Sequence, residues 1–136
     1  MTHFPPVPSG SNILGIGIDL IENARIEKAL ERQGKVFEER IFTPEEIRYC
    51  RSHRNHSIHF AARFAAKEAI SKALGTGIGQ DFGWKTASIE SGREGSPHVV
   101  LDVVGQNLLK QRMAKNVLIS LSHTKDLSTA IALLIG

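Results

Sequence analysis

The sequence predicts a compact α+β fold, with strands near both ends of the chain and one long helix in the middle. Residues 13–21 alternate apolar side chains with glycine or aspartate, which is the period of a strand. Residues 60–74 are rich in alanine and contain neither glycine nor proline, so they favour a helix. Residues 117–122 and 128–135 are apolar and joined by a short polar connection, which is typical of a hairpin.

Length and composition indicate one soluble domain in a reducing compartment. We expect the domain to span residues 13–136, and residues 1–12, rich in proline, serine and glycine, to form a disordered tail. Cys50 is the only cysteine, so an internal disulfide is excluded and the cytoplasm is the expected location. We expect no membrane span and no signal peptide. The net charge of +3 favours anionic partners.

The first predicted strand has two different faces. One face carries leucine and isoleucine, and the other carries Gly15, Gly17 and Asp19. Glycine in a strand indicates close approach by a ligand or by another backbone. We therefore expect a bare groove along this strand that ends at the Asp19 carboxylate. A β-bulge followed by an ordinary surface aspartate is the alternative.

A helix is predicted next, with Asn23 as its N-cap and Gly34 near its end. Ile26 and Leu30 share its core face. Its polar side carries a stripe of three basic residues, Arg25, Lys28 and Arg32. Residues 43–46 read Thr-Pro-Glu-Glu, a capping box that predicts another short helix, and a loop over residues 51–56 follows.

The central helix is expected to be buried on almost every side, because its apolar residues surround the helical wheel. Gly75 supplies its C-terminal stop. Glu68 and Lys72 lie four positions apart, either as an ordinary helical ion pair or as members of a site, since charges are rarely buried without a partner or a metal. Six alanines between residues 60 and 74 indicate that something packs very close to this helix.

Strands dominate the second half of the chain. Residues 85–90 and 98–101 predict one hairpin, and residues 117–122 and 128–135 predict another around a turn at residues 123–127. Between the hairpins, Asp102 is expected to cap a helix that ends near Ala114. Its inward side chains are predicted to be Val104, Leu108 and Leu109.

Two further patterns invite interpretation. His53, His56 and His59 recur at every third position, but a structural zinc site generally has four ligands including cysteine, so solvated histidines are preferred. The glycines at positions 75, 77 and 79 follow a helix rather than a strand, which excludes a dinucleotide-binding loop. What remains is Asp19, Glu68 and Lys72. Two carboxylates and a lysine suit Mg²⁺ and a phosphate-containing substrate, although such a set is weakly specific alone.

Three segments resemble the holo-acyl-carrier-protein synthase family, the short single-domain type of 4′-phosphopantetheinyl transferase. They read Gly-Ile-Gly-Ile-Asp at residues 15–19, Arg-Phe-Ala-Ala-Lys-Glu-Ala at residues 63–69 with Lys72 beyond, and Ser-Leu-Ser-His at residues 120–123. They occur in the family's order and spacing, and the similarity covers residues 13–135. One departure is Gly-Ser-Pro at residues 95–97, where the family often has Gly-Lys-Pro.

The resemblance implies Mg²⁺-dependent transfer of 4′-phosphopantetheine from coenzyme A to a serine of apo-acyl carrier protein, in fatty acid biosynthesis. The other product would be adenosine 3′,5′-bisphosphate. By the family motif, Asp19 and Glu68 are metal ligands, and Lys72 faces the pyrophosphate. These three form the catalytic group. Arg63 and His123 match family positions near coenzyme A.

The resemblance also implies a homotrimer with active sites between subunits, and a carrier-protein docking surface on the helix after Asp19. The basic stripe defined above lies on that helix, and acyl carrier proteins are acidic. The alternative is a solvated face balanced by Glu27 and Glu31. The group that deprotonates the serine stays open between Glu68, Asp19 and a metal-bound water.

Two other classes of function agree less well with the sequence. A module that binds a nucleotide or carrier protein without catalysis would be expected to lack Asp19, Glu68 or Lys72, and all three are present. A nucleic-acid binder would suit the positive charge, but aromatic residues make up only 6% of the chain, too few for base stacking. We therefore expect no nucleic-acid partner.

Overall fold

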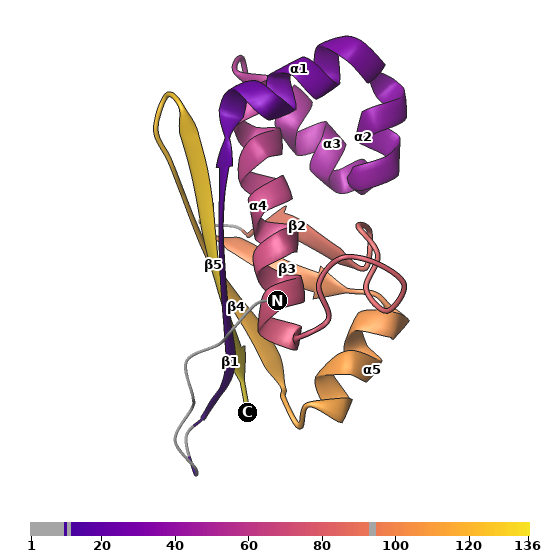
Figure 1. The fold of residues 1–136 in the computed structure, drawn as a ribbon, viewed down its shortest axis with the longest axis vertical. Coiled ribbons are helices and arrows are strands. Elements are labelled where there is room, and N and C mark those ends of the chain that lie inside the picture. The colour runs from indigo at the N-terminus through magenta and orange to yellow at the C-terminus, as the bar shows by residue number, and fades with distance from the viewer. Residues whose placement is uncertain (1–9, 11, 93–94) are drawn as a thin grey trace.

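The computed structural model describes residue 10, residues 12–92 and residues 95–136, and it has the predicted α+β architecture (Figure 1). The helices are α1 (Asn23–Gln33), α2 (Lys35–Ile41), α3 (Pro44–Arg51), α4 (His56–Leu74) and α5 (Val103–Gln111). The strands are β1 (Ile13–Glu22), β2 (Ala87–Ser91), β3 (Pro97–Leu101), β4 (Asn116–His123) and β5 (Leu127–Ile135). Apart from residues 10 and 12, the predicted tail lies outside the described residues.

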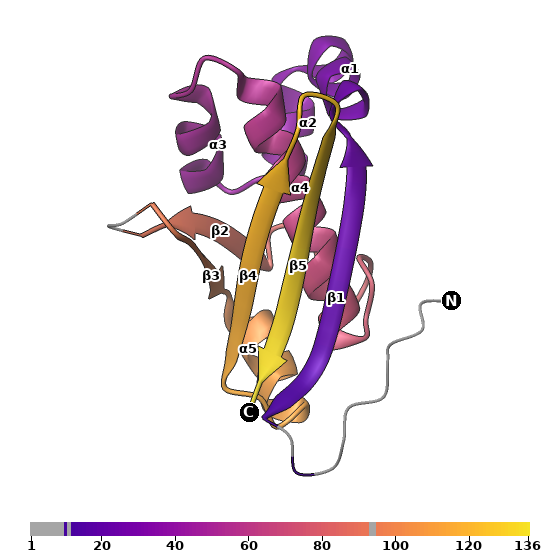
Figure 2. The same ribbon diagram turned by 90° about the vertical axis from the view of Figure 1, so that its left-hand side faces the viewer.

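A three-stranded antiparallel sheet in the order β1-β5-β4 forms one side of the molecule, and β2 and β3 form a separate antiparallel ribbon. The first strand of the chain thus pairs with the last, with Gly17 opposite Ala132 and Asp19 opposite Ala130. Helix α4 runs along one face of the sheet (Figure 1), and the ribbon lies beside the β4 edge, where β3 contacts β4 (Figure 2). Both predicted hairpins are confirmed.

Helix α4 packs against the inner face of the sheet, and the glycines of β1 explain how it comes so close. A Cβ atom at Gly17 would lie 2.0 Å from the carbonyl oxygen of Ala69, and one at Gly15 would lie 2.4 Å from that of Ala73. The partner of the glycines is therefore another backbone, as the alanines of α4 predict. The expected bare groove along β1 is wrong, because α4 fills it.

The outer face of the sheet is apolar and uncovered. Figure 2 looks directly at this face, and no described helix lies in front of it. Ile18 and Leu20 are 62% and 61% exposed there, and Leu118 on β4 is 54% exposed. Ile131 pairs with Ile18 across β1 and β5 and is also exposed. The leucine–isoleucine face of β1 therefore points away from the core of the chain.

The start of α1 differs from the prediction. Glu22 occupies the N-cap position, and Asn23 is the first helical residue. The Asn23 side chain instead ties α1 to the β4–β5 turn: its Nδ2 donates to the carbonyl oxygens of Thr124 and Lys125 at 3.1 and 3.0 Å. Its Oδ1 accepts from the Ser128 hydroxyl at 2.6 Å. The asparagine therefore serves tertiary packing rather than capping.

Helices α2 and α3 follow α1 after short connections. Helix α2 was not predicted, and Gly34, at φ 55°, separates it from α1. The predicted capping box of α3 is confirmed, since the Thr43 hydroxyl accepts from the Glu46 amide and the Glu46 carboxylate accepts from the Thr43 amide.

None of the helices in the described part of the chain is long and apolar enough to cross a membrane.

Helix α5 is shorter than predicted, and two of its three predicted inward residues, Leu108 and Leu109, pack against the core. It ends at Gln111, and Met113 then adopts a φ of 58° in the turn to β4. Asp102 caps it as predicted, accepting from the Gly105 amide at 2.9 Å. Val104 is 50% exposed, so its predicted inward position is wrong. The buried position is Gly105, where a Cβ atom would lie only 2.9 Å from the Cβ of Leu101.

Candidate active site

Asp19 and Lys72 meet where β1 crosses α4. The Lys72 ammonium lies 3.0 Å from Oδ1 of Asp19 and donates to the carbonyl oxygen of Ile18 at 3.0 Å. The Asp19 backbone is fixed from the other side, because the Thr129 hydroxyl donates to its carbonyl oxygen at 2.7 Å. The close packing of β1 on α4 thus brings together two charges that lie far apart in the sequence.

Glu68 lies one helical turn before Lys72 and is partly buried. Its pKa is raised from the ordinary value of 4.5, chiefly by burial and secondly by the negative charge of Asp19, while Lys72 acts in the opposite direction. Asp19 and Lys72 are thus the charged neighbours that act on the Glu68 carboxyl group. The structure therefore brings Lys72 to Asp19 and places Glu68 one helical turn before Lys72.

The donor set of this group fits Mg²⁺. The two carboxylates offer only oxygen atoms, and Mg²⁺ is usually held by one or two carboxylates together with water and substrate phosphates. The repulsion that raises the pKa of Glu68 would be relieved by a divalent cation between the two acids. Among the described residues, no group of three or more histidine, cysteine, aspartate or glutamate side chains is arranged to hold a metal.

Arg63 and His123 belong to a second cluster, at the N-terminal half of α4. The Arg63 guanidinium is buried and stacks over the Tyr49 ring, with Cζ 3.9 Å from the ring centroid. The ring of His123 lies 6.3 Å from that of His59, which lies 4.1 Å from that of His53. These five residues form what we call the Tyr–His–Arg cluster. Within the described residues, no hydrogen bond or ion pair joins it to Asp19, Glu68 or Lys72.

The Tyr–His–Arg cluster changes the interpretation of the histidines. His59 is packed between aromatic rings rather than fully solvated, and burial together with the nearby positive groups lowers its pKa to about 4. The Arg63 Nε atom is buried without a hydrogen-bond partner in the described part of the chain. Buried polar atoms are normally satisfied, so this nitrogen is an exception among the described residues.

Comparison with known proteins places this geometry in a family. A sequence profile described as the 4′-phosphopantetheinyl transferase superfamily matches residues 15–132. A holo-[acyl-carrier-protein] synthase from Chlamydia trachomatis is 46% identical over 122 residues, which is 89% of this chain and 98% of the relative. The chain belongs to the holo-acyl-carrier-protein synthase family of 4′-phosphopantetheinyl transferases.

Solved structures agree with this assignment. The holo-[acyl-carrier-protein] synthase of Neisseria meningitidis superposes with a TM-score of 0.84 at 31% identity, covering 91% of this chain and 99% of that one. The Helicobacter pylori enzyme, solved in complex with coenzyme A, superposes with a TM-score of 0.78 at 32% identity, covering 88% and 98%. The resemblance drawn from three sequence segments is therefore confirmed over nearly the whole domain.

A buried ion pair in this transferase was not predicted. Lys67 and Glu46 have side chains that are 0% exposed, and the ammonium lies 2.7 Å from the carboxylate. Burial lowers the pKa of Lys67, and the Glu46 charge partly offsets this. Lys67 also donates to the carbonyl oxygens of Trp84 and Ala87. The sequence signal that could have revealed the pair is a further lysine on a helix expected to be buried on almost every side.

Two other features lie outside the transferase site. Burial raises the pKa of the Cys50 thiol to about 12, which makes it a poor nucleophile.

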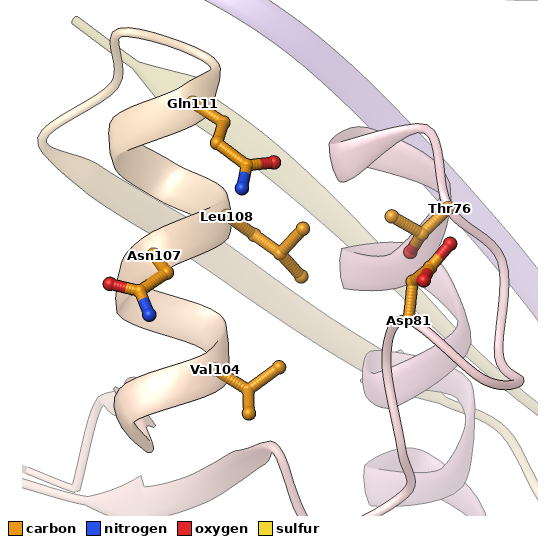
Figure 3. A pocket seen from close by; sticks show the side chains of 6 residues that line it. All are labelled: Thr76, Asp81, Val104, Asn107, Leu108 and Gln111. Atoms are coloured by element: carbon orange, nitrogen blue, oxygen red, sulfur yellow. The ribbon is translucent and has the colours of Figure 1, made fainter.

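A cavity of about 460 Å³ opens between α5 and the segment that follows α4 (Figure 3). Its lining residues are Thr76, Asp81, Val104, Asn107, Leu108 and Gln111. It contains none of the sequence-predicted site residues.

Proposed function

We propose that this chain transfers 4′-phosphopantetheine from coenzyme A to a serine of apo-acyl carrier protein, in a Mg²⁺-dependent reaction of fatty acid biosynthesis. The observation that carries the proposal is the convergence of Asp19, Glu68 and Lys72 in a chain of this family. The coenzyme A bound to the Helicobacter pylori relative supports the choice of donor. A single cysteine fits a reducing compartment, and we propose the cytoplasm.

Each residue of the catalytic group has a distinct part in the proposed mechanism. Lys72 places a positive charge where the pyrophosphate of coenzyme A would lie, which favours the extra charge of the transition state. Asp19 and Glu68 would hold Mg²⁺, which when bound neutralises pyrophosphate charge. Both carboxylates, Glu68 and Asp19, are also candidates to accept the serine proton.

The products define which phosphorus–oxygen bond forms and which one breaks. The serine oxygen forms a bond to the phosphorus that carries pantetheine, and the bond from that phosphorus to the bridging oxygen breaks. Adenosine 3′,5′-bisphosphate leaves with the bridging oxygen. Arg63 and His123 are proposed to contact coenzyme A, because they match family positions near that ligand.

The carrier protein is proposed to dock on the basic stripe of α1. Arg25, Lys28 and Arg32 are exposed, whereas Ile26 on the opposite side of the helix is buried. Glu27 and Glu31 lie off the stripe and line a separate cavity of about 310 Å³ with arginines from the α3–α4 region. The acidic residues therefore leave the stripe free to attract an acidic partner.

A homotrimer is the proposed assembly, and the uncovered apolar face of the sheet is the proposed contact between copies. An exposed patch of isoleucine and leucine on a small domain is typical of a protein interface. In one chain the Tyr–His–Arg cluster is separate from Asp19 and Glu68. In a trimer, Arg63 and His123 of one copy would reach coenzyme A held by the next.

The reaction is tested by incubating the protein with coenzyme A, apo-acyl carrier protein and Mg²⁺, followed by intact-mass measurement of the carrier protein. We expect the mass to increase by one phosphopantetheine group, and we expect no increase with excess EDTA. A carrier protein whose acceptor serine is replaced by alanine is the control. An unchanged carrier-protein mass in the presence of Mg²⁺ would contradict the proposed function.

A further inference from the structure

Lys67 lies at the centre of a hydrogen-bond network that joins three segments of the chain. Its ammonium donates to the carbonyl oxygen of Trp84 at 2.8 Å and to that of Ala87 at 2.6 Å, and it pairs with the Glu46 carboxylate. An ammonium has three N–H donors, so these three acceptors use all of them. With a side chain that is 0% exposed, Lys67 has no donor left for a substrate.

Both carboxylate oxygens of Glu46 also have hydrogen-bond partners. Its Oε1 accepts from the Thr43 amide at 2.8 Å as part of the capping box, and its Oε2 accepts from the Ile89 amide at 2.8 Å. The ion pair therefore connects the start of α3 and the middle of α4 with β2. Replacing such a buried pair with apolar residues is often neutral for stability, but apolar residues could not hold the backbone of Trp84 and Ala87.

The Trp84 segment packs against α4, the helix that carries Glu68 and Lys72. The Trp84 ring packs against Phe64 with ring centroids 4.7 Å apart, and Phe64 lies one helical turn before Glu68. The segment is held to α4 at two levels: its backbone by Lys67 and its ring by Phe64. Phe64 lies in the same row of α4 as Glu68 and Lys72, and with Trp84 it forms an aromatic wall at the start of that row.

We infer that Lys67 is a positioning residue for coenzyme A: it fixes the Trp84 backbone so that the Trp84–Phe64 wall is preformed before coenzyme A binds. The inference rests on the proposed function. A preformed wall avoids the cost of ordering the segment when the ligand arrives, so its loss would weaken binding rather than slow chemistry. Lys67 acts through Trp84 and touches no reacting atom.

The test uses Trp84 itself, because it is the only tryptophan in the chain and its fluorescence reports on this segment alone. The double variant Lys67→Met/Glu46→Gln removes both buried charges and releases the two carbonyl groups. We expect the KM for coenzyme A to rise about tenfold, kcat to change less than about threefold, and the KM for carrier protein to stay the same. We expect acrylamide quenching of Trp84 to increase roughly twofold because the segment loosens.

Two comparisons separate positioning from a general structural role. Glu46→Gln weakens the ion pair but leaves Lys67 bonded to Trp84 and Ala87, so it should lower the unfolding midpoint without raising the KM for coenzyme A. Glu38→Gln/Arg51→Met removes the ion pair between α2 and α3 and should leave both Trp84 quenching and this KM unchanged.

The double variant is measured at low temperature in sucrose, which favours the folded state of a marginal variant. A folded variant with the parent's KM and parent's quenching would overturn the inference, and so would a variant that fails to fold even in sucrose. Trp84 quenching and direct titration with coenzyme A need no turnover. Failure of the transfer reaction in the parent would therefore be distinguishable from failure of this inference.

Discussion

His59 shows how one side chain responds to its packing. Its ring lies 4.1 Å from the ring of His53 and 5.7 Å from that of Tyr49, and the positive charge of Arg63 is nearby. Burial and these neighbours disfavour the imidazolium, so the pKa of His59 falls from 6.5 to about 4. The folded state therefore requires a neutral His59 over a range in which an unfolded chain would protonate it.

This lowered pKa predicts a loss of stability in acid. The stabilisation is fully present above pH 6.5 and is lost as the pH falls through about 4, because the unfolded state binds the proton more readily. His59→Phe keeps an aromatic ring but cannot titrate, so its free energy of unfolding should decrease less over this range. Urea unfolding at several pH values measures the difference, with the exposed His98→Phe as control. Identical pH dependence in the parent and His59→Phe would contradict the assignment.

At the level of residues, the sequence predicts the proposed catalytic group but not the contacts around it. Asp19, Glu68 and Lys72 were recognisable because each charge interrupts an apolar or glycine-rich stretch. The stacking of His59 near His123 was not predictable, because it depends on how the last hairpin lies against α4. The tertiary partners of Lys67 were hidden for the same reason.

Among the contacts between elements, the packing of β1 on α4 is the most sensitive to one added methyl group. Gly17→Ala would place a Cβ atom 2.0 Å from the Ala69 carbonyl oxygen and 2.8 Å from the Ala73 amide nitrogen, both backbone atoms. We expect a loss of stability of about 3 kcal/mol or more, at the upper end of overpacking effects.

The matched control for Gly17→Ala is Gly79→Ala, because Gly79 is exposed and a Cβ atom there has no described neighbour within 4 Å. This variant should change stability by less than about 0.5 kcal/mol. Thermal or urea unfolding compares the two. Equal stability in Gly17→Ala and the parent would show that the strand does not need glycine for this approach.

Helix α1 carries the prediction about the carrier protein. Arg25→Glu reverses one charge of the basic stripe, so the KM for carrier protein should rise about tenfold while the KM for coenzyme A changes little. Added salt should raise the parent's KM for carrier protein and have a smaller effect on the variant. A change in coenzyme A binding instead would assign the stripe to the nucleotide site.

The elements that sequence reasoning missed have identifiable physical causes. Helix α2 has no side-chain cap and follows Gly34, so the sequence carries no local capping signal for its start. The glycines of β1 signalled close approach correctly, but their pattern is the same for a ligand and for a helix backbone. Likewise, strict alternation gave β1 two faces without showing that its leucine–isoleucine face lies outside.

On the scale of the whole molecule, the apolar outer face of the sheet predicts self-association. Leu118→Lys places a charge on this face, on the edge strand β4, and should convert the proposed trimer into single chains with lower activity. Val103→Lys is the control, because Val103 is 72% exposed on α5 and lies outside the sheet. Light scattering coupled to size-exclusion chromatography gives the mass. A parent protein that is monomeric and fully active would contradict the trimer.

The most direct test of the central claim is the rate of phosphopantetheine transfer at saturating Mg²⁺, measured by intact mass for the parent, Glu68→Ala and Lys72→Ala. Loss of a group that stabilises the transition state should lower kcat by roughly 10²–10³-fold in each variant. Glu90→Ala, which removes a carboxylate on β2, should retain the parent's rate. Unchanged circular dichroism would show that both site variants still fold. A Glu68→Ala protein that transfers phosphopantetheine at the parent's rate would contradict the claim that Asp19, Glu68 and Lys72 form the catalytic centre.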